Sequence, residues 1–268
     1  MMKLKVGFIG AGNMGSALAS AASRAGCDVF LYDKDEKKAC DAAEKISAKY
    51  LEGGKISESC DFIFLAVKPN IIPIAINEIK DYLAKRNTPY TVVSMAAGVS
   101  IEKLETAFLP IKAPIIRIMP NTPVAYGKGM TLFAKNEAVT ADMENGFIEI
   151  MKSSGRLDAI PEKLIDAASA ISGCGPAFVY MFIEALADGG VECGLPRDKA
   201  LLYAAETLIG AAETVKQSGK HPGELKDAVC SPGGSTIEGV LALEDGAFRS
   251  TAASAVAAAY EKTLRLGK

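Results

Sequence analysis

The feature that most constrains the fold is a glycine pattern near the start of the chain. The strand-like run KVGFI leads into a GxGxxG turn, and a helix-like run follows. The turn comprises Gly10, Ala11, Gly12, Asn13, Met14 and Gly15. Between a strand and a helix, with an acidic residue closing the next strand, this pattern indicates a site for a dinucleotide. The glycines permit a tight turn, backbone approach to a pyrophosphate and helix–strand packing, and the helix N–H groups face the phosphates. A glycine turn without a ligand is the alternative.

Strand-like and helix-like segments alternate over residues 1–160. Several strand candidates are nearly continuous runs of Val, Ile and Phe, as expected of strands buried on both faces of a mostly parallel sheet. The candidates are residues 5–10, 28–32, 61–67, 90–95, 114–119, 130–134 and 156–160. Amphipathic stretches lie between them. We therefore predict an α/β fold with an N-terminal Rossmann-like doubly wound sheet that binds NAD(P).

The character of the sequence changes after Pro161. Residues 161–268 contain no convincing strand, and six helix-like stretches follow one another. Proline near several starts and glycine after several ends match helix boundary chemistry. Alanine-rich faces such as AASAVAAAY permit close helix contacts. We predict an all-helical domain over residues 161–268 that buries these faces, in part against another subunit.

Composition excludes several classes of partner. A net charge of -2 supplies no basic face for nucleic acid. The best apolar run for a spanning segment, FIFLAV, is strand-sized and far below the roughly 20 residues that cross a bilayer. Glycines and an asparagine interrupt the N-terminal apolar stretch, which argues against a cleaved signal. The six cysteines form no CxxC pair, which favours reduced thiols over disulfides or zinc. We expect a cytoplasmic protein without a metal.

Asp33 and Lys34 bear on the choice of cofactor. Asp33 closes the strand DVFLYD, where a carboxylate would hold the adenosine ribose hydroxyls and repel a 2′-phosphate. Lys34 follows directly and could neutralise such a phosphate, although a solvated loop lysine is an equal reading. The sequence therefore leaves NADH and NADPH open.

Two other turns are expected beside the dinucleotide. In open α/β sheets ligands lie beyond the carboxyl ends of strands. One turn follows the third long strand and comprises Ala66, Val67, Lys68 and Pro69. The other contains Ala96 and Ala97, whose small side chains would let the nicotinamide half pass. A strand that simply ends in an exposed Lys-Pro is the alternative for the first turn.

The single histidine bears on the reaction type. Hydride transfer to a carbonyl usually employs a proton donor such as His, Lys or Tyr. His221 stands next to Pro222 at an expected helix start, which favours a structural or surface role. A cyclic iminium already carries its proton and needs no such donor. The sequence is thus consistent with C=N reduction, although Lys or water could also donate.

Four motifs in the remaining sequence resemble, in order, those of the pyrroline-5-carboxylate reductase family. They are RIMPNTP (117–123), SGCGPA (172–177), ADGG (187–190) and SPGGST (231–236). With GFIGAGNMG and FLAVKP they span almost the whole chain. The resemblance implies reduction of L-1-pyrroline-5-carboxylate to L-proline, the last step of proline biosynthesis, with NADPH or NADH. It also implies a homodimer with interlocking helical domains, sometimes built into a larger ring such as a decamer.

The resemblance also assigns residues. It implies that the nicotinamide is bordered by Met119, Pro120 and Asn121. It implies that the substrate is surrounded by Glu162, Ser231, Gly233, Gly234, Ser235 and Thr236. Because the loop at 233–236 opens a helix, its N–H groups and dipole can hold the substrate carboxylate. Thr236 is the expected catalytic residue, which orients the ring nitrogen.

Two positions depart from the family pattern. Ala228 stands where close relatives often carry Asn, so the resemblance implies that a polar contact to the cofactor from the partner subunit is missing here. Cys174 stands where serine is common, and a packing role is favoured there over a reactive thiol. Two other functions stay open at this point. One is a reductase of similar design acting on a hydroxyacid or another imine, and the other is a nucleotide sensor without turnover.

Overall fold

The computed structural model describes residues 3–266 and divides the chain into two compact units. The first contains the residues up to Cys174 together with those from Ala259 onward, and the second is Gly175–Ala258. The last strand, β8 (Gly155–Ala159), ends where the sequence predicts a change to helices. The first unit nevertheless continues through helix α7 (Glu162–Ser172), because Ile165 of this helix is fully buried in the core against the sheet.

One eight-stranded sheet forms the centre of the first unit, in the order β3-β2-β1-β4-β5-β6-β7-β8. Neighbouring strands are parallel except for the antiparallel pair β6–β7. The chain order reverses between β1 and β4, so a ligand crevice is expected there. The other strands are β1 (Lys5–Ile9), β2 (Asp28–Tyr32), β3 (Lys49–Tyr50), β4 (Phe62–Leu65), β5 (Thr91–Ser94), β6 (Ile115–Met119) and β7 (Gly129–Lys135). All seven expected strands are confirmed; β3, with two residues at the sheet edge, was missed.

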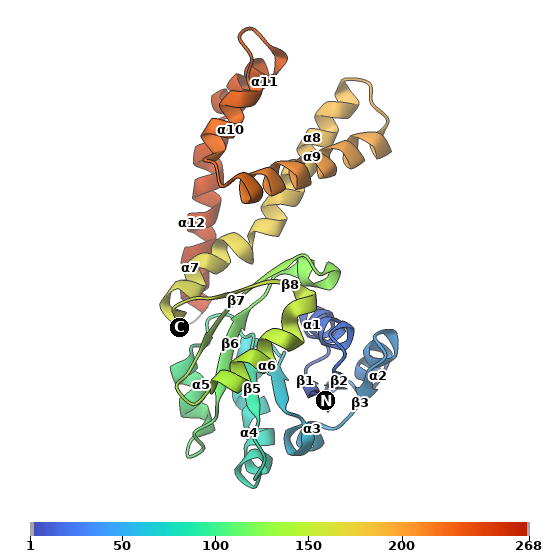
Figure 1. Cartoon of the computed structure of the whole chain (residues 1–268), viewed down its shortest axis with the longest axis vertical. Helices are drawn as coiled ribbons and strands as arrows, with labels where there is room; N and C mark the ends of the chain where they lie inside the picture. The colour runs from blue at the N-terminus through green and yellow to red at the C-terminus, as the bar shows by residue number, and fades with distance from the viewer. Residues whose placement is uncertain (1–2, 267–268) are drawn as a thin grey trace. The chain divides into compact units, whose positions relative to one another are not determined.

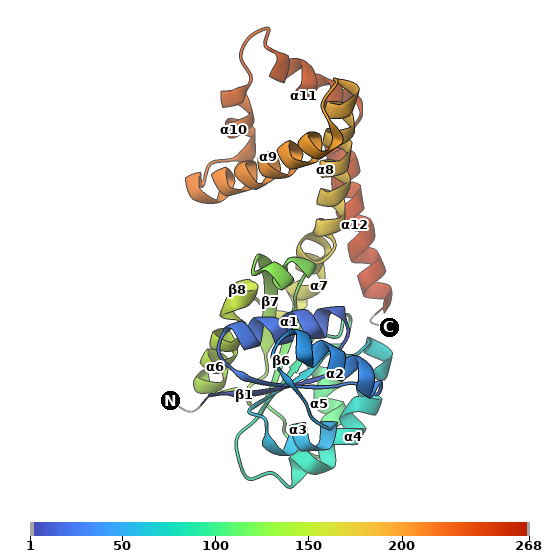
Figure 2. The same cartoon turned by 90° about the vertical axis from the view of Figure 1, so that its right-hand side faces the viewer.

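Helices cover both faces of this sheet, which confirms the doubly wound prediction (Figures 1 and 2). One face is covered by α1 (Asn13–Arg24), α2 (Glu36–Lys45) and α6 (Ala141–Met151). The other is covered by α3 (Gly53–Ser59), α4 (Ile72–Ala84), α5 (Ile101–Phe108) and α7. Buried apolar residues on every one of these helices turn toward the sheet, so two cores form, one on each side.

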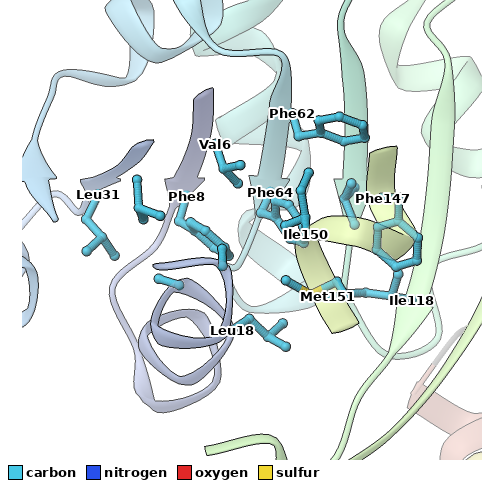
Figure 3. Packing of buried hydrophobic residues seen from close by; sticks show 14 of the residues in the cluster. Val6, Phe8, Leu18, Leu31, Phe62, Phe64, Ile118, Phe147, Ile150 and Met151 are labelled. Carbon is cyan, nitrogen blue, oxygen red and sulfur yellow. The ribbon is translucent and has the colours of Figure 1, made fainter. Parts of the chain in front are cut away.

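Aromatic packing fixes the two strands that flank the crevice. Phe8 of β1 and Phe64 of β4 are fully buried and stack with their ring centroids 4.5 Å apart. Figure 3 shows Leu18 of α1 and Ile150 of α6 in the same cluster. Large buried aromatic rings dominate the energetics of such cores. The stack therefore holds the two neighbouring strands together just before the turns at their carboxyl ends.

The second unit is entirely helical in the described residues and has a small core. Its elements are α8 (Gly175–Glu192), α9 (Arg197–Ser218), α10 (Pro222–Val229), α11 (Ser235–Asp245) and most of α12 (Phe248–Leu266). The buried residues of this core are Ala187, Ala200 and Ala204. Larger apolar side chains are exposed, among them Tyr180, Met181, Leu202, Tyr203 and Ile209. Extended apolar surface of this kind marks an association site.

The helical stretch Glu162–Glu192 is long and apolar enough, by length and composition, to cross a membrane. This corrects the expectation that no apolar run approaches that length. The expectation counted uninterrupted apolar runs, whereas this stretch is apolar on average although polar residues such as Glu184 and Asp188 interrupt it. One such helix is weak evidence for a membrane, because core helices of soluble proteins and signal sequences pass the same test.

Charges placed on the exposed apolar surface should prevent association of the second unit. We predict that the double substitution Met181→Glu and Leu202→Glu gives a lower-mass species in sedimentation at micromolar concentration, because burying unpaired carboxylates is costly. These side chains are 70% and 50% exposed in the single chain. The control introduces carboxylates at exposed polar positions, Lys199→Glu with Gln217→Glu. An unchanged mass for the first variant would contradict the prediction.

Candidate coenzyme and substrate sites

The glycine turn after β1 is shaped by three different requirements. Gly10 has φ +111°, and a Cβ at this position would lie 2.5 Å from the carbonyl oxygen of Ala66. A Cβ on Gly15 would collide with the carbonyl oxygen of Gly10. A Cβ on Gly12 would meet nothing within 4 Å, so this residue is the open side of the turn. Gly12 also caps α1 without a side-chain hydrogen bond, which leaves the helix start free for an anion.

Asp33 is held in place at the end of β2. Its Oδ2 accepts hydrogen bonds from the backbone N–H of Ala11 and from Lys38 Nζ, both at 2.9 Å, and its Oδ1 accepts from Asp35 N–H at 3.2 Å. Partial burial acts to raise the pKa of Asp33, but these three hydrogen bonds outweigh it and the pKa lies below its ordinary value. The carboxylate is therefore charged at neutral pH and positioned for a ribose hydroxyl.

A cavity of about 330 Å³ joins the predicted coenzyme residues. It lies at the switch point and is lined by Gly10, Gly12, Asp33, Lys34, Ala66, Val67 and Lys68, among others. Ala11, Asn13, Met14 and Gly15 belong to the turn and first helical turn beside it, and Pro69 begins the short 3-10 helix η1 (Pro69–Ile71). The glycine cradle, the fixed carboxylate and this cavity fit a dinucleotide. Lys38 and Glu78 also line the cavity, and the sequence reading did not single them out.

Two of the three lysines that line this cavity, Lys34 and Lys38, form ion pairs. Lys34 Nζ lies 3.1 Å from Glu78 Oε1, with both side chains well exposed. Lys38 pairs with Asp33 as described. Exposed ion pairs contribute little to stability, so Lys34 is free to turn toward a ligand phosphate at small cost.

The turns after β5 and β6 carry the remaining predicted coenzyme residues. Ala96 is buried, and its neighbour Ala97 is half-buried. Met119 closes β6, and Pro120 and Asn121 follow it. The Asn121 side chain is turned inward, since Nδ2 donates to Ser172 O at 2.8 Å and Oδ1 accepts from Met130 N–H at 2.9 Å. A contact from Asn121 to the coenzyme would therefore come from its backbone.

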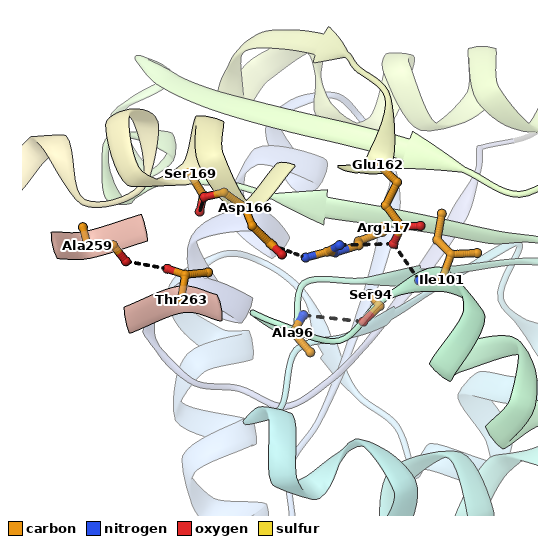
Figure 4. A network of polar contacts seen from close by, with 9 residues as sticks. All are labelled: Ser94, Ala96, Ile101, Arg117, Glu162, Asp166, Ser169, Ala259 and Thr263. Atoms are coloured by element: carbon orange, nitrogen blue, oxygen red, sulfur yellow. Dashed lines mark hydrogen bonds and ion pairs between the residues drawn. The ribbon is translucent and has the colours of Figure 1, made fainter. Parts of the chain in front are cut away.

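Glu162, the first residue of α7, is part of an ion-pair cluster in the first unit (Figure 4). Its Oε1 accepts from the backbone N–H of Ile101 at 2.7 Å and from Arg117 Nη1 at 3.1 Å. Arg117 Nη2 donates to Asp166 Oδ1 at 2.6 Å. The Arg117 residue is 3% exposed. Sequence reasoning placed Arg117 in a motif but gave it no role, and it did not identify Asp166.

The predicted substrate turn lies in the second unit, at the start of α11. Gly233 has φ +66°, a left-handed conformation that favours glycine. Gly234 N–H donates to Ser231 O at 3.0 Å, and a Cβ on Gly234 would collide with the Ser231 hydroxyl. Gly234 caps α11 without a side-chain hydrogen bond. The hydroxyls of Ser235 and Thr236 stand at this exposed helix start.

Other reactive side chains have structural explanations. His221 caps α10, because its Nδ1 accepts from Gly223 N–H at 3.1 Å, which agrees with the structural role expected for it. All six cysteines are free. Burial raises the pKa of the Cys60 thiol to about 12. Within residues 3–266, no group of three or more His, Cys, Asp or Glu side chains is placed to hold a metal ion.

A switch-point cavity, a glycine cradle and a carboxylate held at the end of β2, in a chain with a helical association region, define an NAD(P)H-dependent oxidoreductase. Comparison with family models agrees. Residues 5–98 match the model described as NADP oxidoreductase, coenzyme F420-dependent. Residues 162–266 match the model of pyrroline-5-carboxylate reductase dimerisation. The chain is therefore expected to form oligomers.

Relatives and solved structures specify the family. The chain is 38% identical to pyrroline-5-carboxylate reductase of Escherichia coli (strain K12) over 272 residues, with 100% of both chains covered. It is 39% identical to that of Pisum sativum, covering 97% of this chain and 95% of the relative. The crystal structure of Plasmodium falciparum pyrroline carboxylate reductase with NADP bound matches with a TM-score of 0.89, 37% identity and 100% of both chains covered. The chain belongs to the pyrroline-5-carboxylate reductase family, which confirms the resemblance.

Two glycine substitutions should separate coenzyme binding from stability. Gly12→Ala should leave the melting temperature within about 2 °C of wild type, because the added methyl meets nothing. It should weaken NAD(P)H binding by about tenfold or more, or ~1.4 kcal/mol, by filling the cradle. Gly15→Ala should destabilise the fold by about 1–3 kcal/mol through overpacking. Fluorescence titration and thermal unfolding measure both; full coenzyme affinity in Gly12→Ala would count against the assignment.

Proposed function

We propose that this chain reduces L-1-pyrroline-5-carboxylate to L-proline, with the substrate carboxylate bound at the turn before α11. The observation that carries this proposal is the start of α11. It has no side-chain cap, a glycine pair precedes it, and three hydroxyls surround it. Such a helix start binds an anion through N–H groups and the helix dipole. Family membership supports the reaction, which is the last step of proline biosynthesis.

The chain's own residues act mainly by positioning. NADPH or NADH supplies the hydride when bound. The start of α1 holds the pyrophosphate, Asp33 holds the ribose, and the Ala66–Pro69 turn flanks the dinucleotide. Ala96, Ala97 and the Met119–Asn121 turn border the nicotinamide half. Holding two reactants in one orientation accounts for much of the rate enhancement in such reactions.

The substrate is held at several atoms. Its carboxylate accepts from the first N–H groups of α11, and the hydroxyls of Ser231 and Ser235 add hydrogen bonds. Thr236 orients the ring nitrogen. Glu162 contributes through Oε2, because its hydrogen bonds within residues 3–266 use only Oε1. A protonated imine needs no further proton, in keeping with a histidine that serves as a helix cap.

We also propose how the chain is organised in the cell. Residues 1–160 bind the coenzyme, and residues 161–268 serve dimerisation and substrate binding. The exposed apolar surface and the match to a dimerisation model support a homodimer. A larger ring such as a decamer is the further assembly that the resemblance implies. The free cysteines support a cytoplasmic location, and the near-neutral charge supports the absence of a nucleic-acid partner.

Removal of the Thr236 hydroxyl tests the substrate site. Thr236→Ala should lower kcat with pyrroline-5-carboxylate by roughly tenfold to 100-fold, since orientation of the ring nitrogen is lost. NAD(P)H affinity should stay nearly intact. Thr236→Ser, which keeps the hydroxyl, is the matched control and should retain most activity. Steady-state oxidation of NADH and NADPH in parallel measures the effect. Full activity in Thr236→Ala would refute the role, and turnover only of a hydroxyacid or another imine would refute the substrate.

A substitution at Lys38 tests whether this residue favours binding of NADPH over NADH. When Lys38 turns toward a 2′-phosphate, Asp33 keeps its hydrogen bonds from Ala11 and Asp35 and so remains stabilised. Lys38→Ala should therefore raise the dissociation constant of NADPH by about tenfold, the scale of one charge-assisted hydrogen bond. The value for NADH should change less than about twofold. Lys37→Ala, an exposed neighbour on α2, is the control. Equal weakening of both coenzymes would contradict this role.

A further inference from the structure

Helix α7 is attached at one end to Arg117 in the middle of β6 and at the other end to Asn121 in the turn after that strand. Its first residue, Glu162, and Asp166 one turn later bind Arg117 of β6. Its last residue, Ser172, accepts a hydrogen bond from the Asn121 side chain, two residues beyond the end of β6. Met119 and Pro120 therefore lie between Arg117 and Asn121, the two residues to which α7 is attached.

Arg117 is the buried point of this attachment. It is 3% exposed and lies two residues before Met119, so both side chains project from the same face of β6. Its Nε has no hydrogen-bond partner in the structure. Burying a guanidinium is costly unless carboxylates compensate, and here two do. The planar fork of arginine binds both at once, whereas a lysine ammonium lacks this geometry.

The same cluster reaches a second turn beside the nicotinamide. Glu162 Oε1 accepts from Arg117 and also from the backbone N–H of Ile101, the first residue of α5. The chain enters α5 directly from the Ala96–Ala97 turn after β5. Figure 4 shows Arg117, Glu162, Asp166 and Ile101 joined in this network. One buried cation of β6 thus links this strand to α7 and, through Glu162, to the start of α5.

We propose that Arg117 is a positioning residue for hydride transfer. Acting through Glu162 and Asp166, it holds α7 and the start of α5 against the end of β6 and so sets the position of the two turns that border the nicotinamide. This inference rests on the proposed function, which places those turns beside the nicotinamide. It assigns Arg117 no contact with substrate or coenzyme.

The test separates positioning from simple stabilisation. Arg117→Met should lower kcat by roughly tenfold to 100-fold, because small misplacements of reacting groups have effects of this size. The dissociation constant of NAD(P)H should change by less than about threefold. The primary deuterium isotope effect on kcat, measured with 4-deuterated coenzyme, should rise as hydride transfer becomes rate-limiting. Arg117→Lys should recover part of the loss.

Milder variants keep the proposal testable if Arg117→Met does not fold. Asp166→Asn removes one of the two carboxylates at a partly exposed position and should lower kcat by roughly threefold to tenfold with the same isotope signature. Glu144→Gln breaks the Lys135–Glu144 ion pair, whose distance is also 2.6 Å, and should leave kcat unchanged. If Arg117→Met does not fold, Arg117→Lys and Asp166→Asn decide the question.

Three results would overturn the proposal. One is a kcat within twofold of wild type in the folded variants. Another is a parallel loss of melting temperature and coenzyme affinity without a change in the isotope effect, which would mean that the cluster only stabilises the fold. Absence of turnover in the wild-type protein would overturn both this proposal and the proposed function, whereas unchanged variants of an active enzyme would overturn this proposal alone.

Discussion

The first unit of this protein depends on one close backbone contact. Three segments meet there and leave no room for a side chain. The turn after β1, the start of α1 and the end of β4 touch through Gly10, Gly15 and Ala66. This close approach sets the width of the crevice and directs the free N–H groups of α1 into it. It also places Ala11 N–H where Asp33 can accept from it. The stack of Phe8 and Phe64 beneath supports the same two strands.

Much of this unit could be predicted because its signals are local. Runs of Val, Ile and Phe identified the buried strands, and glycine spacing identified the turn at residues 10–15. The cavity brings Gly10, Asp33 and the Ala66–Lys68 turn together as expected. The edge strand β3 was missed because two residues are too few to show a period. The helices after residue 161 were predicted well, since proline and glycine mark their ends.

Contacts between distant residues left no such signal. Arg117 pairs with carboxylates 45 and 49 residues further along the chain. The sequence around each of the three residues contains no pattern that predicts this ion-pair cluster. The resemblance placed Glu162 beside the substrate but could not show that one of its oxygens already holds Ile101 and Arg117. In the same way, Lys38 reads as one lysine in a charged helix until the fold brings it to Asp33.

The alanine core of the second unit has a consequence for how much enzyme a cell obtains from a given amount of chain. Three alanines bury too little apolar surface to hold several long helices in water, so partner subunits complete the fold. The stability of such a protein depends on protomer concentration. When the chain is scarce, a larger share stays unpaired and open to proteases and chaperones. Enzyme activity should then rise more steeply than expression, so that halving the gene dose costs more than half of the reductase.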